Sequence, residues 1–213
     1  MKFPLVHFIN LESRTDRLEK ITKNLNDLGI EYERVDAVKE RAAAGPGFSH
    51  CKCIDIAIEK DLDMILVCED DVLFHTDTVE RFKKCFEELP EDWDIFIGGA
   101  STLSHPKKYN DLIFKVGFFT GIHFVFYRKS SYQKVKTWEN SKLRNLRRRR
   151  KINYTRKPHI DRFMGSKSLR GDLNIYCPKE FIVDTYEIWS NLRGNVKNDK
   201  QLFDKAKAIA KNA

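Results

Sequence analysis

Short apolar runs alternate with amphipathic stretches over the first seventy residues of the chain. Leu5–Asn10, Ile30–Ala37 and Met64–Cys68 are rich in β-branched or alternating apolar residues, which is typical of strands. Between them, Arg14–Leu28 carries apolar residues at helical spacing, and Phe48–Glu59 is a second amphipathic helix. This order of strand, helix, strand, helix and strand predicts a parallel, right-handed α/β sheet.

The rest of the chain continues this mixture without an internal repeat or a low-complexity linker. We therefore expect one α/β domain over residues 1–213. Lys39–Gly47, rich in Ala, Gly and Pro, is predicted to be a loop. Further helices are expected at Thr78–Leu89, Ser130–Trp138, Ile160–Ser168 and Asn198–Asn212, the last a polar helix that docks weakly, and further strands at Trp93–Ile97, Ile122–Tyr127, Asn174–Cys177 and Phe181–Val183.

Three acids, Glu69, Asp70 and Asp71, follow directly on the apolar run Met64–Cys68. Adjacent carboxylates repel one another and lose hydration, so a cation or a proton is needed to offset their charge. The carboxyl end of a strand is also where ligands bind in open α/β sheets. The triplet therefore indicates a hard-metal site for the phosphates of a nucleotide-linked substrate. Acids after a strand also occur as charge near a helix start, and Thr76-Asp77 opens a helix shortly afterwards.

Other polar residues lie where predicted strands end or helices begin, and each has two interpretations. Arg14 and Arg17 share one face and can reach an anion, or one of them pairs with Asp16 or a nearby Glu. Asp36 can accept hydrogen bonds from a ribose, or cap the next loop. Ser49 is a good N-terminal cap for the second helix, with His50 beside it.

The net charge of +8 is concentrated in one segment, residues 142–157. That segment holds nine of the 39 bases and no acid, so the remaining 30 bases balance 31 acids. It is interpreted as a solvated loop, or as a surface for an anionic acceptor or a membrane. Nucleic acid is disfavoured because Tyr154 is the segment's single aromatic residue.

The five cysteines are an odd number, and Cys68 and Cys85 fall on predicted buried faces, as reduced thiols do. His50-Cys51-x-Cys53 has no second pair at zinc-ligand spacing. No apolar run approaches the ~18 residues of a membrane span, and no signal peptide is recognised. We expect a cytoplasmic protein, or a domain of a longer chain.

Several motifs in order resemble glycosyltransferase family 25, the lipooligosaccharide and procollagen galactosyltransferases. The resemblance covers most of residues 5–192. It rests on Asn10-Leu11-x-x-Arg14-x-Asp16-Arg17, Leu28-Gly29-Ile30-x-Tyr32-x-Arg34-Val35-Asp36-Ala37, Gly47-x-Ser49-His50, Ile65-Leu66-Val67-x-Glu69-Asp70-Asp71, Thr120-Gly121-x-His123-x-Val125-x-Tyr127, Pro158-x-Ile160-Asp161 and Ser190-Asn191-Leu192.

The resemblance implies a GT-A type nucleotide-sugar-binding fold and an inverting transfer of galactose or glucose from a UDP-sugar, with Mn²⁺ or Mg²⁺. The acceptor would be a hydroxyl on a glycan, on hydroxylysine or on a lipid-linked sugar. By carry-over, Asp71 ligates the metal with Glu69 as a second candidate ligand, and Glu69 or Asp70 supports the ribose or a metal-bound water. The nucleotide pocket would be lined by Asn10, Leu11, Arg14, Arg17, Asp36, Ser49, His50, Glu69 and Asp70.

Inversion also needs a carboxylate that accepts the acceptor's proton. Asp161 is the first candidate for this catalytic base, with Asp94 and Asp184 as rivals. Two other classes of protein remain open: an inactive transferase-like protein that binds an anionic partner through residues 142–157, and a metal-dependent phosphoesterase or nucleotidyltransferase.

Overall fold

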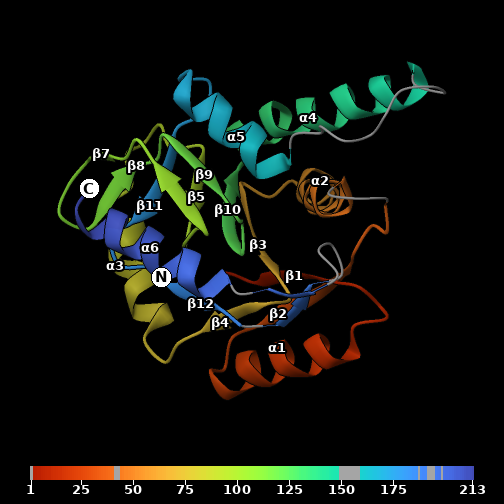
Figure 1. The fold of residues 1–213 in the computed structure, drawn as a ribbon, viewed down its shortest axis with the longest axis horizontal. Helices are drawn as coiled ribbons and strands as arrows, with labels where there is room; N and C mark the ends of the chain where they lie inside the picture. The colour runs from red at the N-terminus through yellow and green to blue at the C-terminus, as the bar shows by residue number, and fades with distance from the viewer. Residues whose placement is uncertain (1, 41–43, 149–158, 187, 191–194, 198) are drawn as a thin grey trace.

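The structure is a computed structural model that describes residues 2–40, 44–148, 159–186, 188–190, 195–197 and 199–213. Its centre is an eight-stranded sheet in the order β2-β1-β3-β10-β5-β11-β8-β7 (Figure 1). The sheet strands are β1 (Val6–Asn10), β2 (Tyr32–Asp36), β3 (Met64–Glu69), β5 (Ile95–Ile97), β7 (Lys107–Lys108), β8 (Ile113–Lys115), β10 (Phe124–Arg128) and β11 (Ile175–Pro178).

The sheet is mixed, with most strands running the same way. β2, β1 and β3 pair in parallel, β10 runs antiparallel between β3 and β5, and β5 is parallel to β11. With β8 antiparallel to both β11 and β7, six of the eight strands share the direction of β3. The predicted α/β fold with a mostly parallel sheet is confirmed, and the reversed strand β10 at its middle is a feature that the sequence did not predict.

Six helices accompany the sheet in the part of the chain that the structure describes. Side chains of β1 alternate, so that Phe8 packs towards α1 and α3 while Ile9 packs towards α2, α4, α5 and α6. In Figure 1, α1 lies below the sheet, and α2, α4 and α5 lie above it. The helices are α1 (Thr15–Asp27), α2 (Ala44–Glu59), α3 (Thr78–Glu87), α4 (Lys129–Arg148), α5 (Ile160–Leu169) and α6 (Asp199–Lys211).

Small two-stranded sheets complete the structure. β12 (Val183–Thr185) pairs with β4 (Val72–Phe74), the strand that directly follows the acid triplet. The other two pairs are β6 (Thr102–Ser104) with β9 (Phe118–Thr120), and β13 (Ile188–Ser190) with β14 (Asn195–Lys197).

Two helices extend well beyond their predicted bounds. α2 begins at Ala44, inside the predicted loop Lys39–Gly47, so Ser49 lies within the helix and is not its N-terminal cap. α4 continues to Arg148, because Lys, Leu and Arg are good helix formers; the basic segment is therefore helical at residues 142–148, and residues 149–158 are outside the described part.

α6 packs more firmly than predicted. Phe203 and Ala210 are fully buried and Ala206 nearly so, and all three join the same hydrophobic cluster as the sheet. None of the helices that the structure describes is long and apolar enough to cross a membrane.

Candidate active site

The acid triplet lies at the carboxyl end of β3, where the register of the sheet gathers polar residues from three strands. Ile9 pairs with Glu69, so Asn10 of β1 lies beside Asp70, and Asp36 of β2 pairs with Asn10. β10 runs the other way, so the residue before it, His123, lies at the same edge, and its carbonyl accepts the N–H of Glu69 at 3.0 Å. The edge of the sheet where a ligand was predicted to bind is thus formed by residues that are far apart in the sequence.

Asp70 is buried and hydrogen-bonded by the first loop. Asn10 Nδ2 donates to its Oδ2 at 2.7 Å, and Arg17 Nη1 donates to its Oδ1 at 2.6 Å. Burial raises the pKa of Asp70, and neighbouring Asp71 adds to this, although Arg17 acts in the opposite direction. Asp70 therefore serves to fix Asn10 and Arg17 beside the site.

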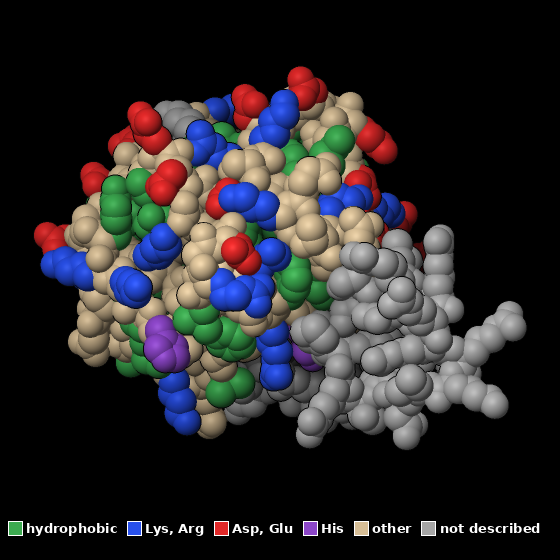
Figure 2. Space-filling model, turned by 90° about the horizontal axis from the view of Figure 1, so that it is seen from above, with side chains coloured by type: hydrophobic (Ala, Val, Ile, Leu, Met, Phe, Trp, Pro, Cys, Tyr) green, Lys and Arg blue, Asp and Glu red, His purple; other side chains and the backbone are tan. Residues whose placement is uncertain are grey.

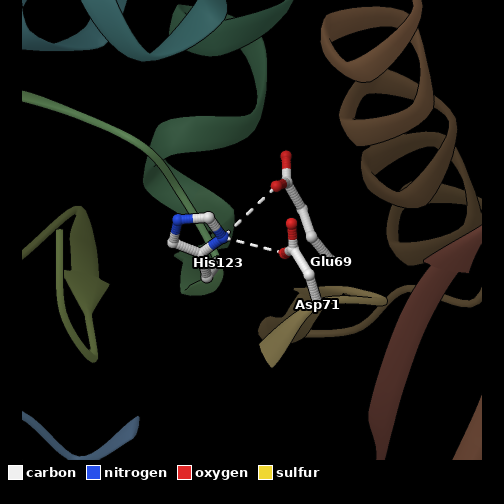
Figure 3. A group of neighbouring side chains, drawn as sticks. All are labelled: Glu69, Asp71 and His123. Carbon is white, nitrogen blue, oxygen red and sulfur yellow. Dashed lines mark hydrogen bonds and ion pairs between the residues drawn. The ribbon is translucent and has the colours of Figure 1, made fainter. Parts of the chain in front are cut away.

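Glu69, Asp71 and His123 converge on one point (Figure 3). His123 Nδ1 lies 3.0 Å from Asp71 Oδ1 and 3.4 Å from Glu69 Oε2, and potential ligand atoms of the three residues all lie within 4.8 Å of one another. His123 is 1% exposed and Asp71 3%. The loop is held in place because the carbonyl of Asp71 accepts the N–H of Tyr186 at 3.0 Å and the hydroxyl of Thr185 at 3.1 Å.

Two carboxylates and one imidazole at this spacing fit a divalent metal ion. Carboxylate oxygens suit hard cations, and imidazole nitrogen suits the first-row transition metals. The far nitrogen of His123, Nε2, lies 3.3 Å from Ser101 Oγ, so the ring already has a partner that fixes its orientation. A possible metal site therefore exists among the described residues. Its third member, His123, belongs to the motif that begins at Thr120-Gly121, but it was not among the predicted site residues.

The expected nucleotide residues fall into two groups. Asn10 and Arg17 contact the acid triplet, and Arg34 joins them, because its Nε donates to Asn10 Oδ1 at 3.1 Å while its Nη1 lies 2.8 Å from Asp36 Oδ1. Asp36 has a side chain that is 70% exposed and open to a ligand at the same edge. Arg34 was not among the predicted site residues, although its alternation with Asp36 along β2 could have indicated it.

Arg14 and Leu11 lie in the loop between β1 and α1. The Arg14 guanidinium donates to both oxygens of Asp16 at 2.8 Å, which lowers the pKa of Asp16 to about 2. This was the alternative interpretation of Arg14. Leu11 is half-buried, and its carbonyl accepts the N–H of Arg14 at 2.8 Å.

Ser49 and His50 of α2 lie behind the acid triplet. Ser49 Oγ accepts the N–H of Val38 at 2.8 Å and donates to the carbonyl of Gly45 at 2.9 Å, so it connects the start of the helix to the end of β2. His50 Nε2 lies 4.0 Å from Glu69 Oε1. Burial lowers the pKa of His50, with Glu69 acting in the opposite direction.

The three candidate bases occupy different places. Asp161, at the start of α5, accepts the N–H of Gly121 at 2.8 Å, two residues from His123; Gly121 has φ +78°, a conformation that favours glycine. Asp184 of β12 is paired with Lys207 at 2.7 Å and with His75 at 3.2 Å. Asp94 precedes β5 at the opposite edge of the sheet, so the structure does not bring it to the triplet.

All five cysteines are buried and free, as expected for reduced thiols. Cys51 and Cys53 belong to the hydrophobic cluster on the α2 side of the sheet. Burial raises the pKa of each of these two thiols to about 12.

Solved structures to which the chain is similar include glycosyltransferases and a CTP transferase. A glycosyltransferase involved in glycosylation of the major capsid of PBCV-1 is 14% identical, with a TM-score of 0.47 over 73% of this chain and 70% of that one. A Drosophila β1,4-galactosyltransferase 7 in complex with manganese, UDP-Gal and xylobiose is 14% identical, with a TM-score of 0.43 over 90% and 68%. The inositol-1-phosphate CTP transferase of T. maritima is 16% identical, with a TM-score of 0.46 over 95% and 77%.

Sequence comparison is more specific. No curated protein matches the chain significantly. Residues 44–148, which include α2, the acid triplet, β10 and α4, match the sequence profile of Glycosyltransferase family 25 (LPS biosynthesis protein). The eight-stranded sheet flanked by helices agrees with the GT-A type α/β fold that the resemblance implied. The predicted resemblance to glycosyltransferase family 25 is thereby confirmed over residues 44–148.

Proposed function

We propose that this chain is an inverting, metal-dependent glycosyltransferase that moves a hexose, galactose or glucose, from a UDP-sugar to an acceptor hydroxyl. The acceptor would lie on a glycan, on hydroxylysine or on a lipid-linked sugar. The observation that supports this most directly is the convergence of Glu69, Asp71 and His123 at the ligand-binding edge of a family 25 domain.

The charge of the site explains why a cation is needed. A diphosphate brought to Glu69, Asp70 and Asp71 would be repelled by three acids, of which Asp70 and Asp71 are ion-paired with Arg17. Mn²⁺ or Mg²⁺ held by Asp71, Glu69 and His123 would neutralise the charge that develops on the departing UDP. Asn10 and Arg34 would orient the nucleotide, and Asp36 would accept hydrogen bonds from its ribose.

Inversion proceeds by one in-line displacement. The acceptor hydroxyl forms a bond to the anomeric carbon while the bond to the phosphate oxygen of UDP breaks, and a carboxylate receives the hydroxyl proton. Asp161 is the proposed base because its carboxylate accepts the N–H of Gly121, which lies two residues before His123.

The donor is tested by thermal shift with UDP, UDP-galactose, UDP-glucose, GDP, CMP and CTP, each with Mn²⁺ or EDTA. A ligand at ~100 times its dissociation constant should stabilise the fold by ~2.7 kcal/mol. We expect a shift with UDP-hexoses that requires Mn²⁺ and is lost in Asp71→Asn, whereas Asp111→Asn, at an exposed loop, should retain it. A shift with CTP alone would favour nucleotidyl transfer, and no shift at all would favour the inactive binding protein.

The base is tested separately with Asp161→Asn. A positioned base contributes ~10²–10⁴-fold, so kcat should fall by that factor while UDP-sugar binding is retained. The measurement is the rate at which radiolabelled sugar is transferred from the UDP-sugar, recorded at increasing acceptor concentration to give kcat. Near-normal turnover with intact donor binding would exclude Asp161 and return attention to Asp184.

A further inference from the structure

Two buried polar residues, His50 and Tyr127, lie directly behind Glu69 and are not explained by donor binding. His50 is 1% exposed and Tyr127 is fully buried. Tyr127 Oη lies 3.0 Å from His50 Nδ1. The other ring nitrogen, Nε2, has no hydrogen-bond partner within the described ranges and is buried.

The phenol determines which nitrogen of His50 carries the proton. Burial raises the pKa of Tyr127 well above its usual value, so the hydroxyl keeps its proton. A buried hydroxyl needs an acceptor, and within the described part of the chain His50 Nδ1 is the partner found for it. Nδ1 must then offer its lone pair, and in a neutral ring the proton resides on Nε2.

The protonated nitrogen faces the candidate metal site. His50 Nε2 lies 4.0 Å from Glu69 Oε1, while Glu69 Oε2 lies 3.4 Å from His123 Nδ1. The Glu69 carboxylate therefore lies between two imidazoles, with one oxygen directed to each. At 4.0 Å the His50 N–H is beyond hydrogen-bond distance and acts on Oε1 by electrostatic attraction, which leaves Oε2 to the group formed with Asp71 and His123.

We propose that His50, held by Tyr127 with its proton on Nε2, is a positioning residue that orients the Glu69 carboxylate towards the Asp71–His123 side of the site. This inference rests on the proposed metal-dependent function. The sequence predicted that His50 binds the nucleotide. In this proposal His50 instead lies behind Glu69 and orients that carboxylate. Residues that orient metal ligands typically change metal affinity by ~10–100-fold when they are lost.

Tyr127→Phe tests the inference because it removes one oxygen and retains the buried ring. Tyr132→Phe is the matched control: Tyr132 is also buried, and its hydroxyl donates to the carbonyl of Leu62 at 3.1 Å, away from the site. Calorimetric titration of the metal-free protein with Mn²⁺ should show ~10–100-fold weaker binding for Tyr127→Phe. Tyr132→Phe should bind within about twofold of the wild type.

Nitrogen NMR of ¹⁵N-histidine-labelled protein in EDTA provides a second readout that does not depend on metal. His50 should be protonated at Nε2 in the wild type, and Glu69→Gln should shift that resonance. A proton on Nδ1, an unmoved resonance, or equal Mn²⁺ affinity in Tyr127→Phe and Tyr132→Phe would overturn the inference. If the wild type binds no Mn²⁺, the metal-dependent function fails, and the NMR result alone decides whether His50 orients Glu69.

Discussion

Buried aspartates lie at both ends of the central sheet, and they have opposite surroundings. Asp94, before β5, receives Lys134 Nζ at 2.8 and 2.9 Å, Ser130 Oγ at 2.7 Å and the N–H of Asn174 at 3.0 Å. Burial by itself would raise the pKa of Asp94, but these hydrogen bonds outweigh it and lower the pKa.

At the other end, the carboxylates of Asp70 and Asp71 are neighbours, and Glu69 faces the same imidazole as Asp71. The pKa of Asp70 is raised, mainly by burial and then by Asp71. Where the protein provides a set of donors for one carboxylate, as at Asp94, the group is a structural anchor. Where carboxylates converge, as at Asp70 and Asp71, they repel one another, and an added cation or proton stabilises the arrangement, which is the property expected of a binding site.

The largest expected effect comes from Asp71. Asp71→Asn removes a charged metal ligand while preserving shape, so transfer should fall by roughly 10²–10³-fold, the several kcal/mol that a metal contributes to charge stabilisation. Folding stability in EDTA should not fall, because a repulsion among carboxylates is removed. Transfer rates and urea unfolding midpoints test this. A destabilised variant with normal transfer per folded molecule would make Asp71 a structural residue like Asp94.

Asp94 should show the reverse pattern. Asp94→Ala removes the acceptor of two part-buried hydrogen bonds, from the N–H of Asn174 and the hydroxyl of Ser130, which should cost roughly 1–3 kcal/mol of unfolding free energy. Lys134, with a side chain that is 42% exposed, can return to water and limits the loss. Transfer per folded molecule should be unchanged. A specific loss of kcat without loss of stability would restore Asp94 as a candidate base.

The sequence could predict one of these two regions better than the other. Glu69, Asp70 and Asp71 are adjacent in the chain, and a buried strand before them indicated the ligand edge from local pattern alone. Asp94 also flanks a predicted strand, so the sequence made it a rival candidate for the catalytic base. Its donors come from Ser130, Lys134 and Asn174, 36 to 80 positions later, and no local pattern connects them.

His123 was missed as a site member for a related reason. A parallel sheet would place the start of a strand at the edge away from Glu69, and β10 brings His123 to Glu69 because it is reversed. α6 was underestimated although Phe203, Ala206 and Ala210 repeat at helical spacing, because its many lysines obscured a narrow apolar face. Local patterns therefore predicted the strands and the acid triplet, and long-range pairing determined the rest of the site.

The smallest expected effect is on how the free energy of unfolding changes with pH, to which Asp94 and Asp70 should contribute with opposite signs. The lowered pKa of Asp94 contributes stability that is present above its unfolded pKa, about 3.9, and is lost as pH falls through the folded value. The raised pKa of Asp70 has the opposite sign: its contribution is present below about pH 3.9 and is lost as pH rises through the folded value. Asp94→Asn should therefore flatten the acid side of the stability profile, and Asp70→Asn should steepen it.

Urea midpoints of the wild type and both variants, in EDTA between about pH 3 and 6, provide the measurement for these two carboxyl groups. Only differences from the wild type are compared, so the other acids of the chain, which titrate alike in all three proteins, cancel. Differences of the same sign for both variants would mean that the two aspartates have similar surroundings in solution. Opposite signs would confirm that one end of the sheet stabilises its buried carboxylate while the other end keeps its carboxylates ready for a cation.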